Sequence, residues 1–185
     1  MTAPPPWDIG RPQPAFEGVA RAGGFVGRVL DVGCGTGEHA LLAASMGLEA
    51  MGVDLAPRAI ELAIDKAAAR GLDATFRVFD ALCLADLGER FDTIVDCGLF
   101  HVFGDDDRVR LVQSVAAVLN PGGRYHMLCF SDRQPGEWGP RRVTEAEIRR
   151  SFVEGWRIDT LEPAVLDINI DPAGAQAWLV GVTRR

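Results

Sequence analysis

Lysine, long apolar runs and a basic leader are what this 185-residue chain most plainly lacks. Its one lysine, Lys66, is followed by alanine, which excludes the Lys-Ser or Lys-Thr pair of a phosphate-binding P-loop. No apolar run approaches the roughly 18 residues of a membrane-spanning helix. The N-terminal sequence MTAPPPWDIGRPQP has neither a basic start nor an apolar core, so we expect no secretory signal. These absences together predict a cytoplasmic protein.

Cysteine is also scarce, and no two of Cys34, Cys83, Cys97 and Cys129 form a CxxC pair. We therefore expect neither a metal site nor a disulfide, but buried free thiols in a reducing compartment. Basic residues are outnumbered, because 19 Lys and Arg stand against 26 Asp and Glu, for a net charge of -7. Such a surface repels a phosphate backbone, which argues against nucleic acid and favours a small-molecule partner. No membrane or protein partner is indicated.

What is present is an ordinary globular composition, 48% hydrophobic and 24% charged, at the length of one domain. Strands are expected at 28–32, 49–53, 74–79, 91–95, 124–130, 156–161 and 176–183, and helices at 38–46, 57–71, 105–119 and 144–152. This alternation predicts an α/β fold with a single-domain, doubly wound, mostly parallel sheet. No helix separates the last two strands, so we expect about seven strands with an antiparallel one at the C-terminus.

Two acidic patterns are typical of helix starts. The run at residues 105–107 lies at the beginning of an apolar-periodic segment, where negative charge favours the helix macrodipole, so we prefer helix capping to metal binding. Thr144 and Glu147 have the spacing of a capping box.

A turn with three alternating glycines, Gly33, Gly35 and Gly37, joins the first strand to the first of these helices. Such turns usually hold a phosphate at the helix N-terminus. A dinucleotide fingerprint, however, requires glycine where this chain has Glu38. That carboxylate, with Asp31 just upstream, would repel a pyrophosphate. The turn therefore favours a cationic ligand without phosphate.

Acidic residues follow three successive strands. Asp31 can favour an ammonium group, Asp54 can accept hydrogen bonds from both hydroxyls of a ribose, and Asp80 can accept one from an adenine amino group. Each alone is equally well explained as a solvated aspartate at a strand end. The carboxyl ends of parallel strands converge, however, and ligands of open α/β sheets bind there. Together the three predict a site for a cationic adenosine derivative.

In these segments the chain resembles the class I S-adenosylmethionine-dependent methyltransferases. The matching segments are VLDVGCGTG, GVDLAP, FDALCL, FDTIVDCGLFHVF and LNPGGRYHMLCF, and they span about residues 28 to 130. The resemblance implies a Rossmann-like methyltransferase fold, S-adenosyl-L-methionine as cofactor, and in-line transfer of its methyl group to a small molecule. The cofactor-binding residues expected on this basis are Trp7, Gly10, Arg11, Asp31, Gly33, Gly35, Gly37, Asp54, Leu55, Asp80, Ala81, Asp96 and Cys97.

The proline-rich segment WDIGRPQP is similar to the N-terminal arm of thiopurine methyltransferase-like enzymes and of their halide and thiol methyltransferase relatives. That resemblance implies that residues 1–27 form an arm and first helix over the cofactor site, in front of a methyltransferase domain at 28–185. Without the resemblance, a disordered tail is an equal alternative. Enzymes of this branch methylate thiols, selenium or tellurium species, halides, phenols and heterocycles.

The residues after the fourth strand, CGLFHVF, are candidates for the acceptor site. His101 is the best candidate for a general base, since histidine titrates near neutrality; the alternative is a histidine that orients the loop or contacts the cofactor. Phe100, Phe103 and Trp138 are candidates for an aromatic substrate wall, and each is equally compatible with the core. The proline-rich acidic tetrapeptide of DNA amino-methyltransferases is missing, which disfavours that class.

The long loop FSDRQPGEWGPRR is expected above the fifth strand, beside the methyl group. Arg133, Trp138, Arg141 and Arg142 are therefore candidates for substrate selection, although surface solubility explains the arginine pair slightly better. Two other functions remain open. A non-catalytic cofactor-binding or sensor module would bind without turnover, and a nicotinamide-dependent oxidoreductase is disfavoured by Glu38.

Overall fold

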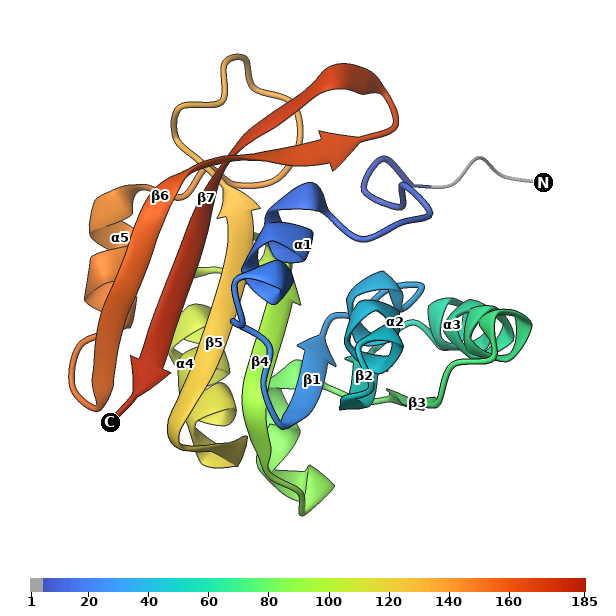
Figure 1. Cartoon of the computed structure of the whole chain (residues 1–185). Coiled ribbons are helices and arrows are strands. Elements are labelled where there is room, and N and C mark those ends of the chain that lie inside the picture. Colours follow the sequence, from blue (N-terminus) through green and yellow to red (C-terminus); the bar gives the residue numbers. More distant parts are fainter. Residues whose placement is uncertain (1–4) are drawn as a thin grey trace.

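Seven strands form one sheet in the computed structural model, which describes residues 5–185; residues 1–4, the start of the expected arm, lie outside the described residues. The strands are β1 (Arg28–Val32), β2 (Glu49–Asp54), β3 (Ala74–Val78), β4 (Phe91–Cys97), β5 (Leu119–Phe130), β6 (Trp156–Ile168) and β7 (Asp171–Arg184). Their order is β3-β2-β1-β4-β5-β7-β6 (Figure 1). The first five pair in parallel, and β7 lies antiparallel between β5 and β6. The predicted sheet is confirmed.

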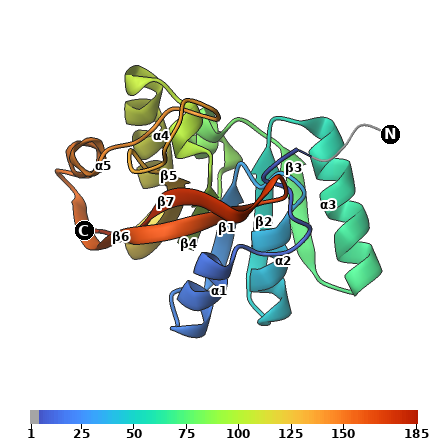
Figure 2. The ribbon, with the colours of Figure 1, turned by 90° about the horizontal axis from the view of Figure 1, so that it is seen from above.

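Helices cover both faces of this sheet. They are α1 (Pro14–Arg21), α2 (Glu38–Ser45), α3 (Pro57–Arg70), α4 (Asp105–Val118) and α5 (Glu145–Ser151), with 3-10 helices η1 (Ala81–Leu87) and η2 (Phe100–Val102). Seen from above, α1 and α2 lie on one side of the strands, and α4 and α5 lie on the other (Figure 2). Of the described residues, none belongs to a helix long and apolar enough to cross a membrane.

The core consists of two apolar clusters, one on each face of the sheet, because neighbouring strand residues point to opposite sides. On β5, Met127 and Cys129 face the cluster under α4 and α5, while Leu128 and Phe130 face the cluster under α1 and α2. All four are buried. The central strands are thus covered on both faces, which is why they read as nearly continuous apolar runs.

The helix starts follow the predicted chemistry in one case and depart from it in the other. Thr144 and Glu147 form the predicted capping box at α5, each side chain accepting the other's backbone N–H. At α4 the N-cap is Gly104, without a side-chain cap, and the acidic residues 105–107 occupy the first turn. There they favour the macrodipole as expected, but they do not cap the helix.

The cysteines are less uniformly buried than predicted. Cys34 and Cys129 are buried free thiols, Cys97 is half-buried, and Cys83 is exposed in η1. The prediction for Cys83 is wrong because the irregular segment after β3 places it on the outer side of a 3-10 helix, which sequence spacing does not reveal.

The C-terminal strands are longer than predicted. β6 and β7 continue as a hairpin to the pair Ile168 and Asp171, where the sequence suggested a loose connection. Pro163 and Gly174 lower the strand propensity of this stretch. Pro163 is tolerated because β6 is an edge strand, which needs donors on one side only.

The tip of this hairpin holds the N-terminal arm. The Gln13 side chain pairs with the Asp167 backbone in both directions, donating to its carbonyl at 3.0 Å and accepting from its N–H at 2.8 Å. Arg11 forms an ion pair with the Asp167 carboxylate at 2.7 Å, and the Asn169 N–H donates to the Pro6 carbonyl at 2.9 Å. Gln13 is only 2% exposed, so these bonds are shielded from water.

Replacing Gln13 by alanine should therefore loosen the arm and destabilise the fold. The change removes two hydrogen bonds and leaves a backbone donor and acceptor of Asp167 unpaired, at a cost of about 1–3 kcal/mol. Urea unfolding measures this free energy. Gln113→Ala, at an exposed site on α4, is the matched control and should change stability by less than about 0.5 kcal/mol. Equal effects of the two changes would mean that the Gln13 side-chain hydrogen bonds contribute nothing to stability.

Candidate active site

The glycine turn lies at the carboxyl end of β1, where the parallel strands converge. Gly37 has φ +87°, and a Cβ on it would lie 2.7 Å from the Phe76 ring and 2.9 Å from Ala63. Gly35 has φ +52° and open space where its Cβ would point. The turn is thus tightly packed beneath Gly37 and open above Gly35, as a ligand cradle requires.

Asp54, the last residue of β2, holds this turn in place. Its Oδ2 accepts from the Gly35 N–H at 2.9 Å and its Oδ1 accepts from the Ala56 N–H at 2.8 Å. Each carboxylate oxygen has a further lone pair, so both can still accept from hydroxyl groups. Leu55 follows with 65% of its surface exposed, an unusual apolar exposure beside the open turn.

Asp31 lies directly under the turn and is completely buried. Its Oδ2 accepts from the Ala40 N–H at 3.1 Å, while Oδ1 has no partner among residues 5–185. Burial raises the pKa of this carboxyl to about 8, with the Ala40 hydrogen bond opposing it. Asp31 therefore holds its proton at pH 7 and would ionise beside a cation.

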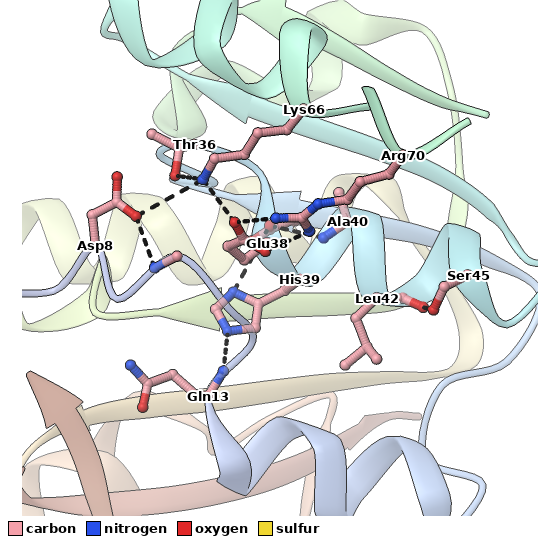
Figure 3. A network of polar contacts seen from close by, with 12 residues as sticks. Asp8, Gln13, Thr36, Glu38, His39, Ala40, Leu42, Ser45, Lys66 and Arg70 are labelled. Carbon is pink, nitrogen blue, oxygen red and sulfur yellow. Dashed lines mark hydrogen bonds and ion pairs between the residues drawn. The ribbon is translucent and has the colours of Figure 1, made fainter. Parts of the chain in front are cut away.

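Glu38, the acid at the third glycine position, is neutralised rather than free (Figure 3). Lys66 donates to it at 2.7 Å and Arg70 at 2.8 Å and 3.0 Å. Burial alone would raise the pKa of Glu38, but the hydrogen bonds from Arg70 and Lys66 outweigh it and lower the pKa. The repulsion of pyrophosphate expected from the sequence is therefore weaker than predicted, because two cations compensate this charge.

The same network reaches the arm (Figure 3). Lys66 also donates to Thr36 in the glycine turn at 2.6 Å and lies 3.9 Å from the Asp8 carboxylate. The Gln13 N–H donates to His39 Nε2 at 3.2 Å, and His39 Nδ1 lies 4.0 Å from Asp31 Oδ2. The arm is thus connected both to the turn and to the buried acid beneath it.

The predicted arm residues occupy different environments. The Trp7 side chain is 64% exposed, and Gly10 has φ +70° at a bend closed by a 3.3 Å hydrogen bond to Asp8. Arg11 is committed to Asp167. The view from above shows the arm passing between the β6–β7 hairpin and the α2–α3 side (Figure 2).

Asp80 and Ala81 lie at the end of the segment that follows β3. Asp80 is half-buried, and its Oδ1 caps η1 by accepting from the Leu82 N–H at 2.8 Å. Its Oδ2 makes no hydrogen bond with residues 5–185 and stays available to a donor. Ala81 is buried beneath it.

Asp96 differs from the other strand-end acids, because its oxygens are already used. Oδ1 accepts from the Leu99 and Phe100 N–H groups and Oδ2 accepts from the Tyr125 hydroxyl at 2.6 Å. Burial raises the pKa of Asp96 to about 6, and the Tyr125 hydrogen bond opposes it. This carboxylate holds the turn after β4 from inside the core, and its expected role in cofactor binding stays a prediction. Cys97 beside it is half-buried, and burial raises the pKa of its thiol.

Phe100 and Phe103 do not form the expected substrate wall. The Phe100 ring is fully buried, stacks on Phe152, and carries the Arg108 guanidinium 4.8 Å above it. Phe103 is partly buried against the same core cluster. The apolar spacing that suggested a wall arises from packing under α4 and α5.

His101 is held by the backbone of β5. Its Nδ1 accepts from the Phe130 N–H at 2.9 Å, and the imidazole meets the Phe130 ring edge to face. Burial, reinforced by Arg108, lowers the pKa of His101 to about 4. The ring is therefore neutral at pH 7, and its Nδ1 is occupied.

Arg133 is held by contacts within the fold, and its role in substrate selection stays a prediction. Its guanidinium donates to Ser131 at 3.2 Å and to the Ala177 carbonyl at 3.2 Å, and lies 4.8 Å from the Trp178 ring centre. Those contacts attach the start of the loop to β7. Trp138 in the same loop is 40% exposed and packs edge to face on Phe130, so it can still contact a ligand.

The adjacent arginines fix the loop rather than solubilise the surface. Arg141 forms ion pairs with Asp105 at 2.7 Å and with Glu147. Arg142 donates to three loop carbonyls, those of residues 134, 136 and 140, and its guanidinium lies 5.3 Å from the Phe130 ring centre. These contacts give both arginines a structural role that the solubility interpretation did not include.

Four residues of this region were missed by sequence reasoning: Gln13, His39, Tyr125 and Phe130. Tyr125 is the only tyrosine and lies in an apolar strand, where its hydroxyl needs a partner, so a signal was present. The others gain their roles through partners distant in sequence, which spacing does not indicate.

The residues at this edge fit an adenosine-bearing, positively charged cofactor. Asp54 and Asp80 offer oxygens at the ends of the neighbouring strands β2 and β3, and Gly35 leaves open space where a Cβ would point. The orphaned Asp31 oxygen suits an ammonium group. No group of three or more His, Cys, Asp or Glu within residues 5–185 is arranged to hold a metal ion.

Comparison with known proteins supports this fit. The family described as a methyltransferase domain matches residues 29–123, about half of the chain. A 2-heptyl-1-hydroxyquinolin-4(1H)-one methyltransferase from Mycobacteroides abscessus is 40% identical over 184 residues, 96% of this chain and 81% of that protein.

Two solved structures share the fold. One, from work on the conversion of a disulfide bond into a thioacetal group during echinomycin biosynthesis, has a TM-score of 0.88 at 37% identity, covering 97% of this chain and 84% of that one. The magnesium protoporphyrin IX methyltransferase of Synechocystis with bound SAH has a TM-score of 0.74 at 20% identity, covering 92% and 81%, which is a likeness of fold alone. With a methyltransferase family matching half of the sequence and a methyltransferase relative matching nearly all of it, the chain belongs to the class I S-adenosylmethionine-dependent methyltransferases.

Proposed function

We propose that this enzyme methylates an ionisable hydroxyl group on a small aromatic heterocycle, of which a 1-hydroxyquinolin-4-one is the nearest example. The observation that carries the proposal is the 40% identity to a hydroxyquinolone methyltransferase across 96% of the chain. That match includes the arm and the loop after β5, where the acceptor is expected, as well as the more general cofactor half.

The chain's part in the reaction is mainly to bind and align. S-adenosylmethionine supplies an activated methyl group and its own leaving group, so the protein must orient the nucleophile and exclude water. Asp54 accepts hydrogen bonds from the ribose and Asp80 accepts one from the adenine amino group. Leu55 offers an apolar surface to the adenine ring. Asp31 balances the ammonium group beneath the glycine turn.

We also assign the arm to the thiopurine methyltransferase-like branch, with residues 1–27 covering the cofactor site. Its support is the double attachment of Gln13, by its side chain to Asp167 and by its backbone to His39. In this arrangement Trp7 and Gly10 belong to the cover, and Arg11 fastens it.

A second candidate acceptor is sulfur. The neighbour from echinomycin biosynthesis, at 37% identity, comes from work on a disulfide-to-thioacetal conversion. Thiols and hydroxyquinolones share an acidic proton and a soft or delocalised anion, so one site can accept both classes.

The test combines calorimetry with S-adenosylmethionine and S-adenosylhomocysteine and a product-coupled screen of 1-hydroxyquinolin-4-one, 4-hydroxyquinoline, thiophenol and iodide. Turnover with the hydroxyquinolone is expected. Turnover with thiophenol alone would assign the sulfur alternative. Binding without turnover would favour a sensor module, and no binding would contradict the cofactor site itself.

Asp54→Asn should weaken cofactor binding about 5- to 150-fold, because it removes charge-assisted hydrogen bonds to the ribose hydroxyls worth about 1–3 kcal/mol. Calorimetric titration gives the two dissociation constants. Asp73→Asn, at an exposed site before β3, is the control and should bind as the unchanged chain does. Equal affinities in all three proteins would refute the ribose role.

Cofactor binding at pH 7 should release up to about one proton from Asp31. The pKa of this buried carboxyl is raised to about 8, so it is protonated at pH 7, and a nearby ammonium group favours the ionised form. Titration in two buffers of different ionisation enthalpy counts the protons.

The number of protons released on binding is measured for the unchanged chain and for Asp31→Asn. The difference between the two numbers separates the Asp31 proton from those of the cofactor. It should shrink as the pH rises above about 8, because Asp31 is then increasingly ionised before the cofactor binds. An identical proton count for both proteins at pH 7 would show that the ammonium group does not act on Asp31.

A further inference from the structure

The tautomer of His101 is fixed by a backbone donor. The Phe130 N–H points at His101 Nδ1 at 2.9 Å, and a backbone N–H can only donate. Nδ1 must therefore carry a lone pair. A neutral imidazole has one N–H, so the proton lies on Nε2.

The surroundings keep this ring neutral. Its neighbours are the Phe130 ring on β5, the backbone of Gly98 after β4, and Arg108 of α4, whose positive charge adds to the effect of burial. Among the charged groups around it, Asp96 has its oxygens occupied by three donors, and Glu147 is paired with Arg108 and Arg141. Protonating His101 would also place a second N–H against that of Phe130.

The distal nitrogen of the ring is available to a ligand. Within residues 5–185, the fully buried side-chain polar atoms without a partner are Asp31 Oδ1 and Arg108 Nη2. His101 Nε2 is neither hydrogen-bonded nor among these atoms, so it reaches solvent through the 6% of the residue that stays exposed.

That nitrogen also lies at the right place. A Cβ on Gly98 would lie 3.4 Å from Nε2, and Gly98 directly follows β4, beside β1 and the glycine turn. In open α/β sheets this point, where the strand order reverses, is where ligands bind. Phe130 and the half-exposed Trp138 continue from the imidazole as an edge-to-face aromatic series.

We propose, on the basis of the function proposed above, that His101 donates a hydrogen bond from Nε2 to the acceptor and is not its base. A base would need an unprotonated Nε2, which the Phe130 N–H prevents. The site then selects an acceptor that arrives as an anion or loses its proton to water. The acceptor anion gives an electron pair to the methyl carbon, the carbon–sulfur bond breaks toward sulfur, and no proton passes to the protein.

Two substitutions of His101 distinguish a hydrogen bond donated by Nε2 from a packing role of the ring. His101→Asn places an acceptor near the position of Nδ1, toward the Phe130 N–H, but has no distal donor. His101→Gln reaches the position of Nε2 with an amide N–H. With 1-hydroxyquinolin-4-one, His101→Asn should lower kcat/KM about ten- to hundredfold, the range for a lost hydrogen bond to a charged group. His101→Gln should recover most of this loss.

The pH profile supplies the decisive comparison. For acceptors of different acidity, the lower limb of kcat/KM should move with the pKa of the acceptor. The proposal would be overturned in favour of a base if both variants lost kcat/KM equally and only with acceptors that are still protonated. Thiophenolate, which is already an anion, would then react as with the unchanged chain.

A spectroscopic measurement tests the tautomer without turnover. Long-range proton–nitrogen correlation of the 15N-labelled chain should show His101 with Nε2 protonated and Nδ1 bare from about pH 5.5 to pH 8. The chain has three histidines, and His101→Asn assigns the signal. A proton on Nδ1, or titration near pH 6.5, would overturn the proposal even if the acceptor is not a hydroxyquinolone.

Discussion

The compensation of Glu38 by Lys66 and Arg70 is the interaction on which the site depends. A carboxylate that is nearly buried at a helix N-terminus is costly without partners, and two cations from α3 supply them. Lys66 extends the same compensation to Thr36 in the glycine turn and to Asp8 in the arm. One neutralised acid thus joins α2, α3, the glycine turn and the arm.

The aspartates near the carboxyl ends of the strands differ in the hydrogen-bond donors that surround them. Asp54 meets two backbone N–H groups and keeps lone pairs toward the open turn. Asp31 meets one, and its other oxygen is left for a ligand. Asp96 is fully buried, and its two oxygens accept from three donors inside the core. All three lie at or next to the carboxyl end of a parallel strand, so the surroundings of each carboxylate, and not the sequence pattern, distinguish them.

The fold, the glycine turn and the capping box were predictable because they depend on local pattern. Strand and helix periodicity, the glycine spacing and the capping box at Thr144 involve residues within a few positions of each other. The contacts of the arm and of His101 were not predictable, since they join segments that are distant in the sequence. Gln13 meets Asp167 across 154 residues, and Phe130 fixes His101 across 29. Phe100 was mistaken for a substrate contact because an aromatic residue after a strand looks the same in sequence whether it faces the core or a ligand.

The same long-range contacts explain how a methyl-transfer site can discriminate with few chemical groups. An acidic acceptor loses its proton to water before it reacts, so a base on the protein gives no advantage with it. What matters instead is the orientation of a nucleophile beside the methyl carbon. In the proposed acceptor site, orientation comes from a rigid imidazole held by a backbone N–H, from the Phe130 ring and from a loop fastened by Arg142. Selectivity of this kind depends on acceptor acidity and shape together: a phenol of high pKa that fitted the site would still react slowly, because its anion is scarce.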